Sequence, residues 1–340
     1  MRRALPLIIL GALLGAWFVF QRGASPLVVY CAHDSIFAEE ILRDFTRQTG
    51  LAVATRYDTE ATKSLGLTEL LVREKDAPRC DVFWNNELLG TLDLREKGVL
   101  APYRGPGWER IPAKYKDAEG RWTGFAARMR VLVINTNVAD AAPAIRLEKG
   151  VCALLDPARM AVAKPLYGTT LTHYSVFWQM WGGARLQAWH REWRGRGVRE
   201  LNGNGAVKDA VAAGVCDFGY TDTDDFFAAK DSGKPVEMRP VRVSDESDAT
   251  ICIPNTVAII RGTKREAAAR KLVDFLLSAE TELALARSKS RQIPLGPVPA
   301  DQVPAEVREL AEWAKAGVDL TQLGPARAEC LAWLKGEYLR

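Results

Sequence analysis

The sequence predicts an α/β protein built from two lobes. Its 340 residues are more than one compact core usually covers, so two lobes are expected. Short apolar runs alternate with helical patterns from residue 27 to residue 97, and a second alternating set begins at residue 131. Such alternation is typical of a largely parallel sheet with helices on both faces.

The composition narrows the class of protein. With 48% hydrophobic and 26% charged residues, the chain matches an ordinary globular protein. The net charge of +4 is spread along the sequence, and the basic run at 191–199 is interrupted by Glu192 and Trp193, as on a solvated helix face. Zinc-finger spacing and RNP-like motifs are both absent from the sequence, so no nucleic-acid partner is expected.

The N-terminus carries an export signal. Arg2 and Arg3 precede an apolar stretch at 5–20, which is the pattern of a secretory signal and is shorter than the roughly 20 residues of a membrane-spanning helix. Cleavage near Ser25 and retention of residues 4–20 as an inner-membrane tether are both open. Residues 1–25 are therefore expected to be a signal peptide or an anchor, and the rest to lie in the periplasm.

The first alternating set starts directly after this segment. Strands are predicted at 27–31, 51–57 and 81–84, and helices at 36–49, 62–75 and 88–97. A polar triplet follows each strand: His33-Asp34-Ser35, Asp58-Thr59-Glu60 and Asn85-Asn86-Glu87. One triplet alone could be a helix cap. Three at one edge of a parallel sheet favour a binding site, since ligands sit beyond the carboxyl ends of such strands.

The second set repeats this arrangement. Strands are predicted at 131–135, preceded by Arg128, at 160–163 and at 216–220. Residues 167–170, Tyr-Gly-Thr-Thr, open a long helix and form either an ordinary cap or a seat for an anion. An apolar strand pair broken at Pro254 is predicted at 251–260, where the chain crosses back to the first lobe. Helices at 266–277 and 279–287 follow it.

The sequence gives little support to catalysis. It contains no GxSxG elbow, P-loop, HExxH or GxGxxG motif, and no nucleophile with a recognisable context. The six cysteines permit disulfides in an exported chain, and one or two structural pairs are expected.

Five segments carry a family resemblance: LVVYCAHDSIFAEEIL, CDVFWNNELLGTLDLREKGVLAPY, WTGFAARMRVLVINT, CDFGYTDTDDFFAA and IPNTVAIIRGTKREAAARKLVDFLLS. In this order and spacing, over residues 27–295, they resemble the type 2 periplasmic solute-binding proteins, in the branch typified by ferric-iron-binding proteins. The resemblance implies the two-lobed type 2 periplasmic-binding-protein fold, with crossing strands near 124–128 and 254–257. It implies a first lobe of residues 26–126 plus 257–340 and a second of residues 127–256.

The resemblance also bears on the ligand. Ferric-binding relatives hold iron with a His after the first strand, a Glu after the third and two adjacent tyrosines in the second lobe. His33 and Glu87 stand at or beside the first two positions. The sequence Thr-Asp-Thr-Asp-Asp at 221–225 replaces the tyrosine pair, directly after Tyr220. Since Fe(III) favours phenolate and carboxylate oxygen, loss of both phenolates counts against iron. A metal site of His33, Glu87, Asp222 and Asp224 stays one hypothesis.

Other ligands fit the same residues. The acidic run suits a cationic solute or a divalent cation, and Arg128 with Thr169 and Thr170 suits an anion. A zwitterion or a metal–anion complex would use both sets. The candidate ligand-binding residues are His33, Asp34, Glu60, Asn85, Glu87, Arg128, Tyr167, Thr169, Thr170, Tyr220, Asp222 and Asp224.

The function expected is that of the substrate-binding component of an ABC uptake transporter. It would act as a monomer that captures a small polar or metal-containing solute, Fe(III) among the candidates, with a permease and an ATPase in the inner membrane as partners. The alternatives are a membrane-anchored ligand-sensing domain and, with less support, a hydrolytic enzyme on the same scaffold.

Overall fold

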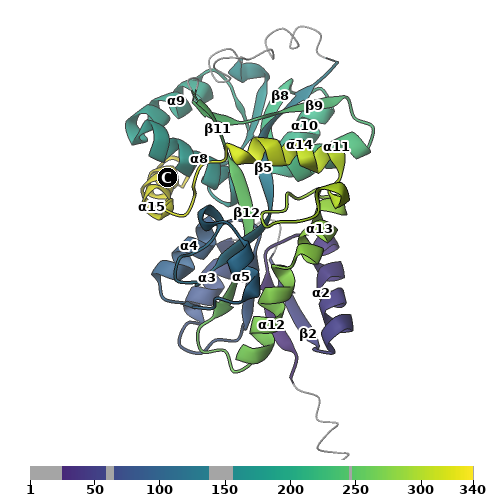
Figure 1. The fold of residues 1–340 in the computed structure, drawn as a ribbon. Helices are drawn as coiled ribbons and strands as arrows, with labels where there is room; N and C mark the ends of the chain where they lie inside the picture. The colour runs from purple at the N-terminus through teal and green to yellow at the C-terminus, as the bar shows by residue number, and fades with distance from the viewer. Residues whose placement is uncertain (1–24, 59–64, 138–155, 245–246, 340) are drawn as a thin grey trace, which may run out of the picture.

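The computed structural model describes residues 25–58, 65–137, 156–244 and 247–339. Two groups of helices and strands lie one above the other and are joined by two long strands, β5 (Thr123–Asn135) and β12 (Cys252–Ile260), as Figure 1 shows. We call the group around β1 the first lobe and the group around β8 the second lobe; their elements are given in the next two paragraphs. The α/β architecture predicted from the sequence is confirmed.

The first lobe is a covered, mostly parallel sheet. Strand order is β2-β1-β3-β12, with β1 parallel to β2 and β3 and with β12 antiparallel to β3. Its strands are β1 (Leu27–Cys31), β2 (Val53–Tyr57), β3 (Val82–Asn85) and β4 (Leu100–Ala101). Its helices are α2 (Ser35–Thr49), α3 (Leu65–Arg73), α4 (Leu89–Glu96), α5 (Pro106–Arg110), α12 (Glu266–Leu276) and α13 (Ala279–Arg287).

The second lobe continues the sheet beyond β5 in the order β5-β8-β6-β7, with β9 added to β5. Its strands are β6 (Met160–Ala163), β7 (Arg199–Leu201), β8 (Phe218–Asp222) and β9 (Val236–Pro240). Its helices are α8 (Gly168–Trp181), α9 (Gly183–Gly195), α10 (Asn204–Ala212) and α11 (Thr223–Asp231). Strand β6 is parallel to β7 and β8, so the carboxyl ends of all three meet at one edge.

The two crossing strands link the lobes through one continuous ladder. The first half of β5 pairs with β12 and its second half with β8. The strands approach closely at Gly124, where a β-carbon would lie 2.7 Å from the Tyr115 carbonyl oxygen and 3.0 Å from Pro254 Cβ. The sequence predicted a strand pair broken at Pro254. The structure shows one strand instead, because Pro254 falls at a β-bulge, where its missing N–H is not needed for a hydrogen bond of the sheet.

The apolar core follows the faces of this sheet. Alternate residues of β5 point to opposite faces, so that Val131 and Val133 belong to one cluster and Leu132 and Ile134 to the other. Both clusters draw residues from both lobes. The sheet is therefore packed as one unit across the crossing strands.

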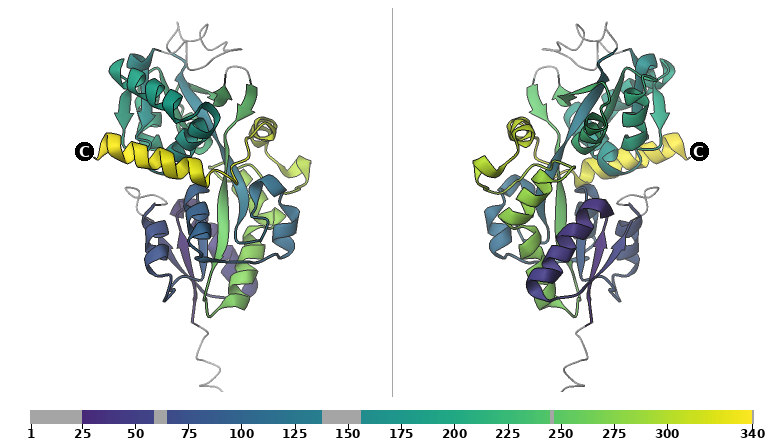
Figure 2. Two further views of the ribbon diagram at one scale, coloured as in Figure 1. Left: turned by 90° about the vertical axis from the view of Figure 1, so that its left-hand side faces the viewer. Right: turned by 90° about the vertical axis from the view of Figure 1, so that its right-hand side faces the viewer.

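The C-terminal region runs back across the molecule. A two-stranded ribbon of β10 (Arg242–Ser244) and β11 (Ser247–Thr250) leads into β12, and α14 (Ala305–Lys315) and α15 (Gly324–Tyr338) follow α13. Figure 2 shows α15 lying across the junction of the two lobes. It meets the first lobe through an Arg327–Asp93 ion pair of 3.1 Å and the second through Trp178, whose Nε1 donates to Glu329 at 3.0 Å.

Two features bear on the exported state. Cys31, Cys80, Cys216, Cys252 and Cys330 are buried free thiols, so the expected structural disulfides are not formed among the described cysteines. Cys152 lies outside the described residues. Within the described parts of the chain, no helix combines the length and the apolar character that crossing a membrane requires.

Candidate functional site

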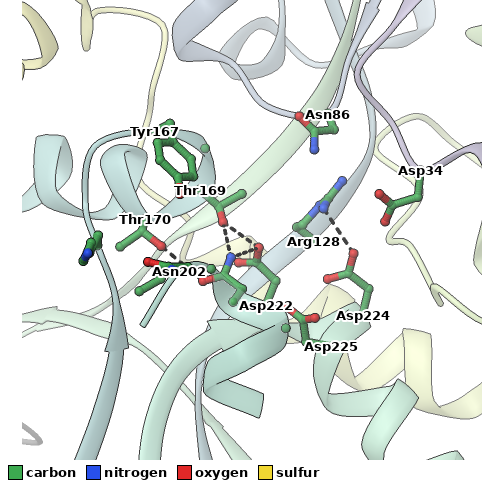
Figure 3. Close-up of a pocket in the computed structure, with 16 residues that line it drawn as sticks. Asp34, Asn86, Arg128, Tyr167, Thr169, Thr170, Asn202, Asp222, Asp224 and Asp225 are labelled. Carbon is green, nitrogen blue, oxygen red and sulfur yellow. Dashed lines mark hydrogen bonds and ion pairs between the residues drawn. The ribbon is translucent and has the colours of Figure 1, made fainter. Parts of the chain in front are cut away.

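A polar cavity of about 280 Å³ lies where the two lobes meet. Asp34 follows β1, Asn86 follows β3 and Arg128 lies on β5; the second lobe contributes the loops that precede α8, α10 and α11. These loops follow β6, β7 and β8, so the cavity sits at the carboxyl ends of strands from both lobes, as the triplet pattern predicted. Figure 3 shows these side chains pointing into a common space.

Three helices begin at the cavity wall. Tyr167, Gly203 and Asp222 are the N-cap residues of α8, α10 and α11, and no N-cap side chain accepts a hydrogen bond at these three described helix starts. The first-turn N–H groups and the positive end of the helix dipole therefore face a region that suits negative charge. Gly168 has φ = +61°, and a β-carbon there would meet nothing within 4 Å, which leaves the start of α8 open.

Asp222 is the most tightly held carboxylate of the site. Its oxygens accept hydrogen bonds from Arg130 Nη1 at 2.7 Å, Thr169 Oγ1 at 2.6 Å and Asn204 Nδ2 at 2.9 Å. The side chain of Arg130 is fully buried and that of Asp222 nearly so. The charge of Asp222 is thus matched within the protein, and its role is to hold Thr169 and Asn204 at the starts of α8 and α10.

Arg128 is the cation at the centre of the cavity. Its Nη1 lies 3.1 Å from Asp224 Oδ2, and its Nε, although buried, has no hydrogen-bond partner among the residues that the structure describes. Burial alone would lower the pKa of the guanidinium, and the surrounding carboxylates, Asp224 foremost, outweigh it and raise that pKa. Arg128 therefore stays charged and has a donor in need of an acceptor.

The second lobe adds further donors. Lys164 lines the cavity and forms no ion pair with any residue in the described ranges. Thr170 Oγ1 donates to Asn204 Oδ1 at 3.1 Å, so that hydroxyl and amide are fixed relative to each other. Asn202 lies at the same wall. Together these groups form a hydrogen-bonding surface around the starts of α8 and α10.

Seven of the twelve candidate residues line the cavity: Asp34, Arg128, Tyr167, Thr169, Thr170, Asp222 and Asp224. Four others lie elsewhere, and the reasons are local. The ring of His33 is buried against Phe37 and Trp84. The ring of Tyr220 packs against His173, and Glu60 lies outside the described residues.

Asn85 and Glu87 serve the first turn of α4. Glu87 accepts hydrogen bonds from the N–H groups of Leu89 and Gly90, the latter at 2.8 Å, and Asn85 Nδ2 lies 3.3 Å from its Oε1. Burial raises the pKa of the Glu87 carboxyl above its ordinary value. Glu87 thus accepts from the first turn of a helix, as in the capping alternative that the triplet pattern left open, and Asn85 holds the Glu87 carboxylate in place.

The carboxylates that lie close together are Asp222, Asp224 and Asp225, whose oxygens fall within 4.8 Å of one another. The four metal ligands expected from the resemblance do not form one group, since His33 and Glu87 lie outside this cluster. Each carboxylate of the cluster already has a protein partner: Arg130, Arg128 and the hydroxyl of Thr221, respectively. A cation bound here would compete with two arginines.

Sequence reasoning missed five polar lining residues: Asn86, Lys164, Asn202, Asn204 and Asp225. Asn86 and Asp225 stand within the polar triplet and the acidic run described above, and a separate signal was present for Asn202 and Asn204. Residues 202–205, Asn-Gly-Asn-Gly, are a loop and helix-start pattern directly after the 199–201 strand. That three-residue strand is too short to stand out by periodicity, so its end was not recognised as part of the same sheet edge.

Comparisons with known proteins agree with this architecture. The family model described as bacterial extracellular solute-binding protein matches residues 40–317. The Fe(3+)-binding periplasmic protein of Serratia marcescens is 27% identical over 197 residues, which cover 57% of this chain and 55% of that protein. Iron-bound HitA of Pseudomonas aeruginosa superimposes with a TM-score of 0.80 at 20% identity, over 92% of this chain and 99% of that one. AfuA of Actinobacillus pleuropneumoniae, solved with fructose-6-phosphate, gives 0.71 at 18%, over 92% and 98%.

Two α/β lobes with a polar cavity at the carboxyl ends of their strands define the class of two-lobed ligand-binding proteins. The chain belongs to the bacterial extracellular solute-binding protein family. It is a solute-binding protein and not an enzyme, which removes the hydrolytic alternative. The alignment with the Serratia relative spans about half of that protein, so its cargo is not carried over to this chain.

Proposed function

We propose that this protein captures a small solute bearing an oxyanion group and delivers it to the permease and ATPase of an ABC transporter. One observation carries the choice of an anion. Arg128 lines a cavity onto which the N-termini of α8 and α10 also open, and its buried Nε has no hydrogen-bond partner among the described residues. An oxyanion in the cavity would complement the guanidinium charge and the helix dipoles.

The size of the cavity supports a molecule over a bare ion. Small-molecule sites span roughly 300–1,000 Å³, and about 280 Å³ lies just below the lower limit of that range. A single metal ion would leave most of this volume to water. Asp34 and Asp224, which also line the cavity, suit hydroxyl or amine groups of the same solute.

A second candidate is a ferric ion bound together with an anion. It is favoured by the Asp222, Asp224 and Asp225 cluster and by the iron-binding names of several relatives. Tyr167 supplies the one phenol group of the described cavity lining, whereas ferric-binding relatives use an adjacent pair of tyrosines. Iron alone is the weaker proposal for this reason.

The first experiment is native mass spectrometry of residues 26–340 purified from a periplasm, with elemental analysis of the same sample. An organic or phosphate-sized adduct without metal supports the oxyanion proposal. A stoichiometric metal together with an anion supports the second candidate. A stoichiometric metal without any anion contradicts both.

A variant pair tests the anion seat directly. Lys164→Met removes a cavity cation that forms no ion pair with the described residues, so we expect the affinity for the co-purified anion, or for inorganic phosphate, to fall at least about tenfold, equivalent to about 1.4 kcal/mol. Isothermal titration calorimetry measures it. Lys271→Met, which removes an exposed lysine of α12, is the matched control and should bind as the wild type does. Equal affinities for both variants would remove Lys164 from the site.

The proposal extends to architecture and location. The lobes would divide at β5 and β12, with residues 26–126 plus 257–340 against residues 127–256, and with α15 reaching across. Residues 4–20 would either be cleaved with the signal or tether the protein to the inner membrane. Fractionation of cells separates these outcomes. Protein found only in membranes would favour the anchored sensor, and free periplasmic protein would favour the transport receptor.

A further inference from the structure

The crossing between the lobes contains an irregularity beside the solute cavity. Along β12, Ile253 and Asn255 are two residues apart, whereas their partners on β5, Arg128 and Phe125, are three apart. The extra residue makes a β-bulge, and Ala126 within it has φ = +43°. Arg128, the central cation of the cavity, lies two residues beyond Ala126 on the same strand.

The backbone N–H and carbonyl groups of the bulge form hydrogen bonds with residues from other parts of the chain. The Ala126 N–H donates to Glu282 Oε1 at 2.9 Å, and its carbonyl oxygen accepts a hydrogen bond from Asn255 Nδ2. Ala127 pairs with Ile293, through two bonds of 2.8 Å, in place of β12. The bulge is therefore a held conformation whose polar groups have fixed partners.

These partners fix the orientation of the Asn255 amide. Because Nδ2 must face the Ala126 carbonyl oxygen, and also lies 2.8 Å from Gln292 Oε1, the Oδ1 atom faces Arg128. The separation from Arg128 Nη2 is 3.4 Å. Asn255 is fully buried, so the reversed amide would place two donors against each other where water cannot relieve them.

The Gln292 amide is oriented in the same way. Its Oε1 accepts from Asn255, so its Nε2 is the donor toward His33 Nε2, 3.1 Å away. His33 precedes Asp34, which lines the cavity. A directed chain of buried hydrogen bonds thus runs from Arg128, which lines the cavity, through Asn255 and Gln292 to His33 in the loop after β1.

We propose that Asn255 is a positioning residue that acts through Arg128: it sets the guanidinium against the solute and ties that contact to the crossing of the strands. The inference rests on the proposed function, in which Arg128 contacts the solute. Asn255 itself does not line the cavity. Any effect of Asn255 on binding is therefore indirect, and Arg128 is the lining residue to which its side chain is hydrogen-bonded.

A double-mutant cycle tests this route, with inorganic phosphate as the probe and calorimetry as the measurement. Asn255→Leu should weaken phosphate binding about tenfold in the wild-type background and less than about twofold in an Arg128→Met background, because the group it positions is then gone. Equal weakening in both backgrounds would show a general structural effect and overturn the inference.

Asn255→Asp separates positioning from stability. A carboxylate keeps an acceptor toward Arg128 and loses the donor toward Ala126 and Gln292. We therefore expect the melting temperature to fall as in Asn255→Leu while phosphate affinity stays within about threefold of the wild type. Affinities that fall in step with melting temperature across the two variants would contradict the inference.

The outcomes distinguish the two proposals. If Arg128→Met weakens phosphate binding and Asn255→Leu does not, the positioning role fails and the anion site stands. If Arg128→Met leaves binding unchanged, or the wild type does not bind phosphate, both proposals fail.

Discussion

Two aspartates only two positions apart, Asp222 and Asp224, have different environments in this site. Asp222 accepts three short hydrogen bonds, one from the fully buried Arg130, whereas Asp224 is paired with Arg128 at the open cavity. The two residues are of the same type and are close in sequence, so neither property explains the difference. The difference arises because Asp222 ends β8 and Asp224 lies in the first turn of α11.

Replacing Asp222 should therefore lower the stability of the fold more than it changes the groups that contact the solute. Asp222→Ala leaves the buried Arg130 without its counter-charge, and we expect a loss of about 3–5 kcal/mol in the free energy of unfolding. Urea denaturation measures it. Asp209→Ala, which breaks a surface pair with Lys208, should stay within about 0.5 kcal/mol of the wild type. Equal losses in the two variants would mean that the buried pair is not retained in solution.

Sequence reasoning led to the sheet edge where the cavity lies, but several of the side chains it selected do not line that cavity. Asp34 and Arg128 were identified, and Asn86 was passed over for its neighbours Asn85 and Glu87. A triplet after a strand shows where the chain turns. It does not show which of three successive side chains points to the cavity, because that depends on the first turn of the following helix.

At the scale of elements, helical spacing and apolar runs predicted the helices and strands with small boundary errors. The predicted helix at 36–49 is α2, and the predicted strand at 81–84 is β3, displaced by one residue. Strand β7 has three residues and carries no periodicity to detect. The packing of α15 could not be predicted either, since its hydrogen-bond partners in other elements lie more than 130 positions away in sequence.

The interface between α15 and α9 should be sensitive to acid. His190 of α9 lies between Tyr174 and Tyr338, whose hydroxyls are 3.1 Å and 3.4 Å from its ring nitrogens, and Trp333 of α15 packs on the ring. Burial lowers the pKa of His190 to about 4, against an ordinary value of about 6.5. Glu200 and Glu337 oppose this lowering, while Arg194 and Arg191 reinforce it.

The lowered pKa of His190 determines how the stability of the fold depends on pH. The neutral ring stabilises the fold above about pH 6.5, and this contribution is lost as pH falls toward 4, because the unfolded chain then binds the proton more tightly. Between pH 7 and pH 5 we expect a loss of about 2 kcal/mol from His190. Urea denaturation at both values should show a smaller loss for His190→Gln. An identical pH dependence in that variant would rule out His190 as the source.

At the scale of the whole molecule, two lobes and their crossing strands were predictable from chain length, alternation and the return of the chain at residues 251–260. The continuity of the core was not. Both apolar clusters extend through β5 and β12, so the lobes share one sheet and are not independently packed bodies. Length alone cannot distinguish these arrangements.

The Arg327–Asp93 pair is a contact between α15 and the first lobe, and both side chains are largely buried. Arg327→Ala should therefore loosen the lobes of the solute-free protein. We expect the radius of gyration from small-angle X-ray scattering to rise by about 1 Å, as in a partial hinge opening. Lys335→Ala, an exposed position on the same helix, should leave it unchanged. An unchanged radius in Arg327→Ala would mean that the crossing strands alone hold the lobes.

The placement of α15 has an evolutionary consequence. A receptor's affinity depends both on its contacts with the solute and on the free energy difference between its open and closed forms. Asp93 and Arg327 lie outside the lining of the solute cavity. Substitutions there could therefore shift the concentration at which uptake begins while leaving the choice of cargo untouched, so that threshold and selectivity can vary independently within one chain.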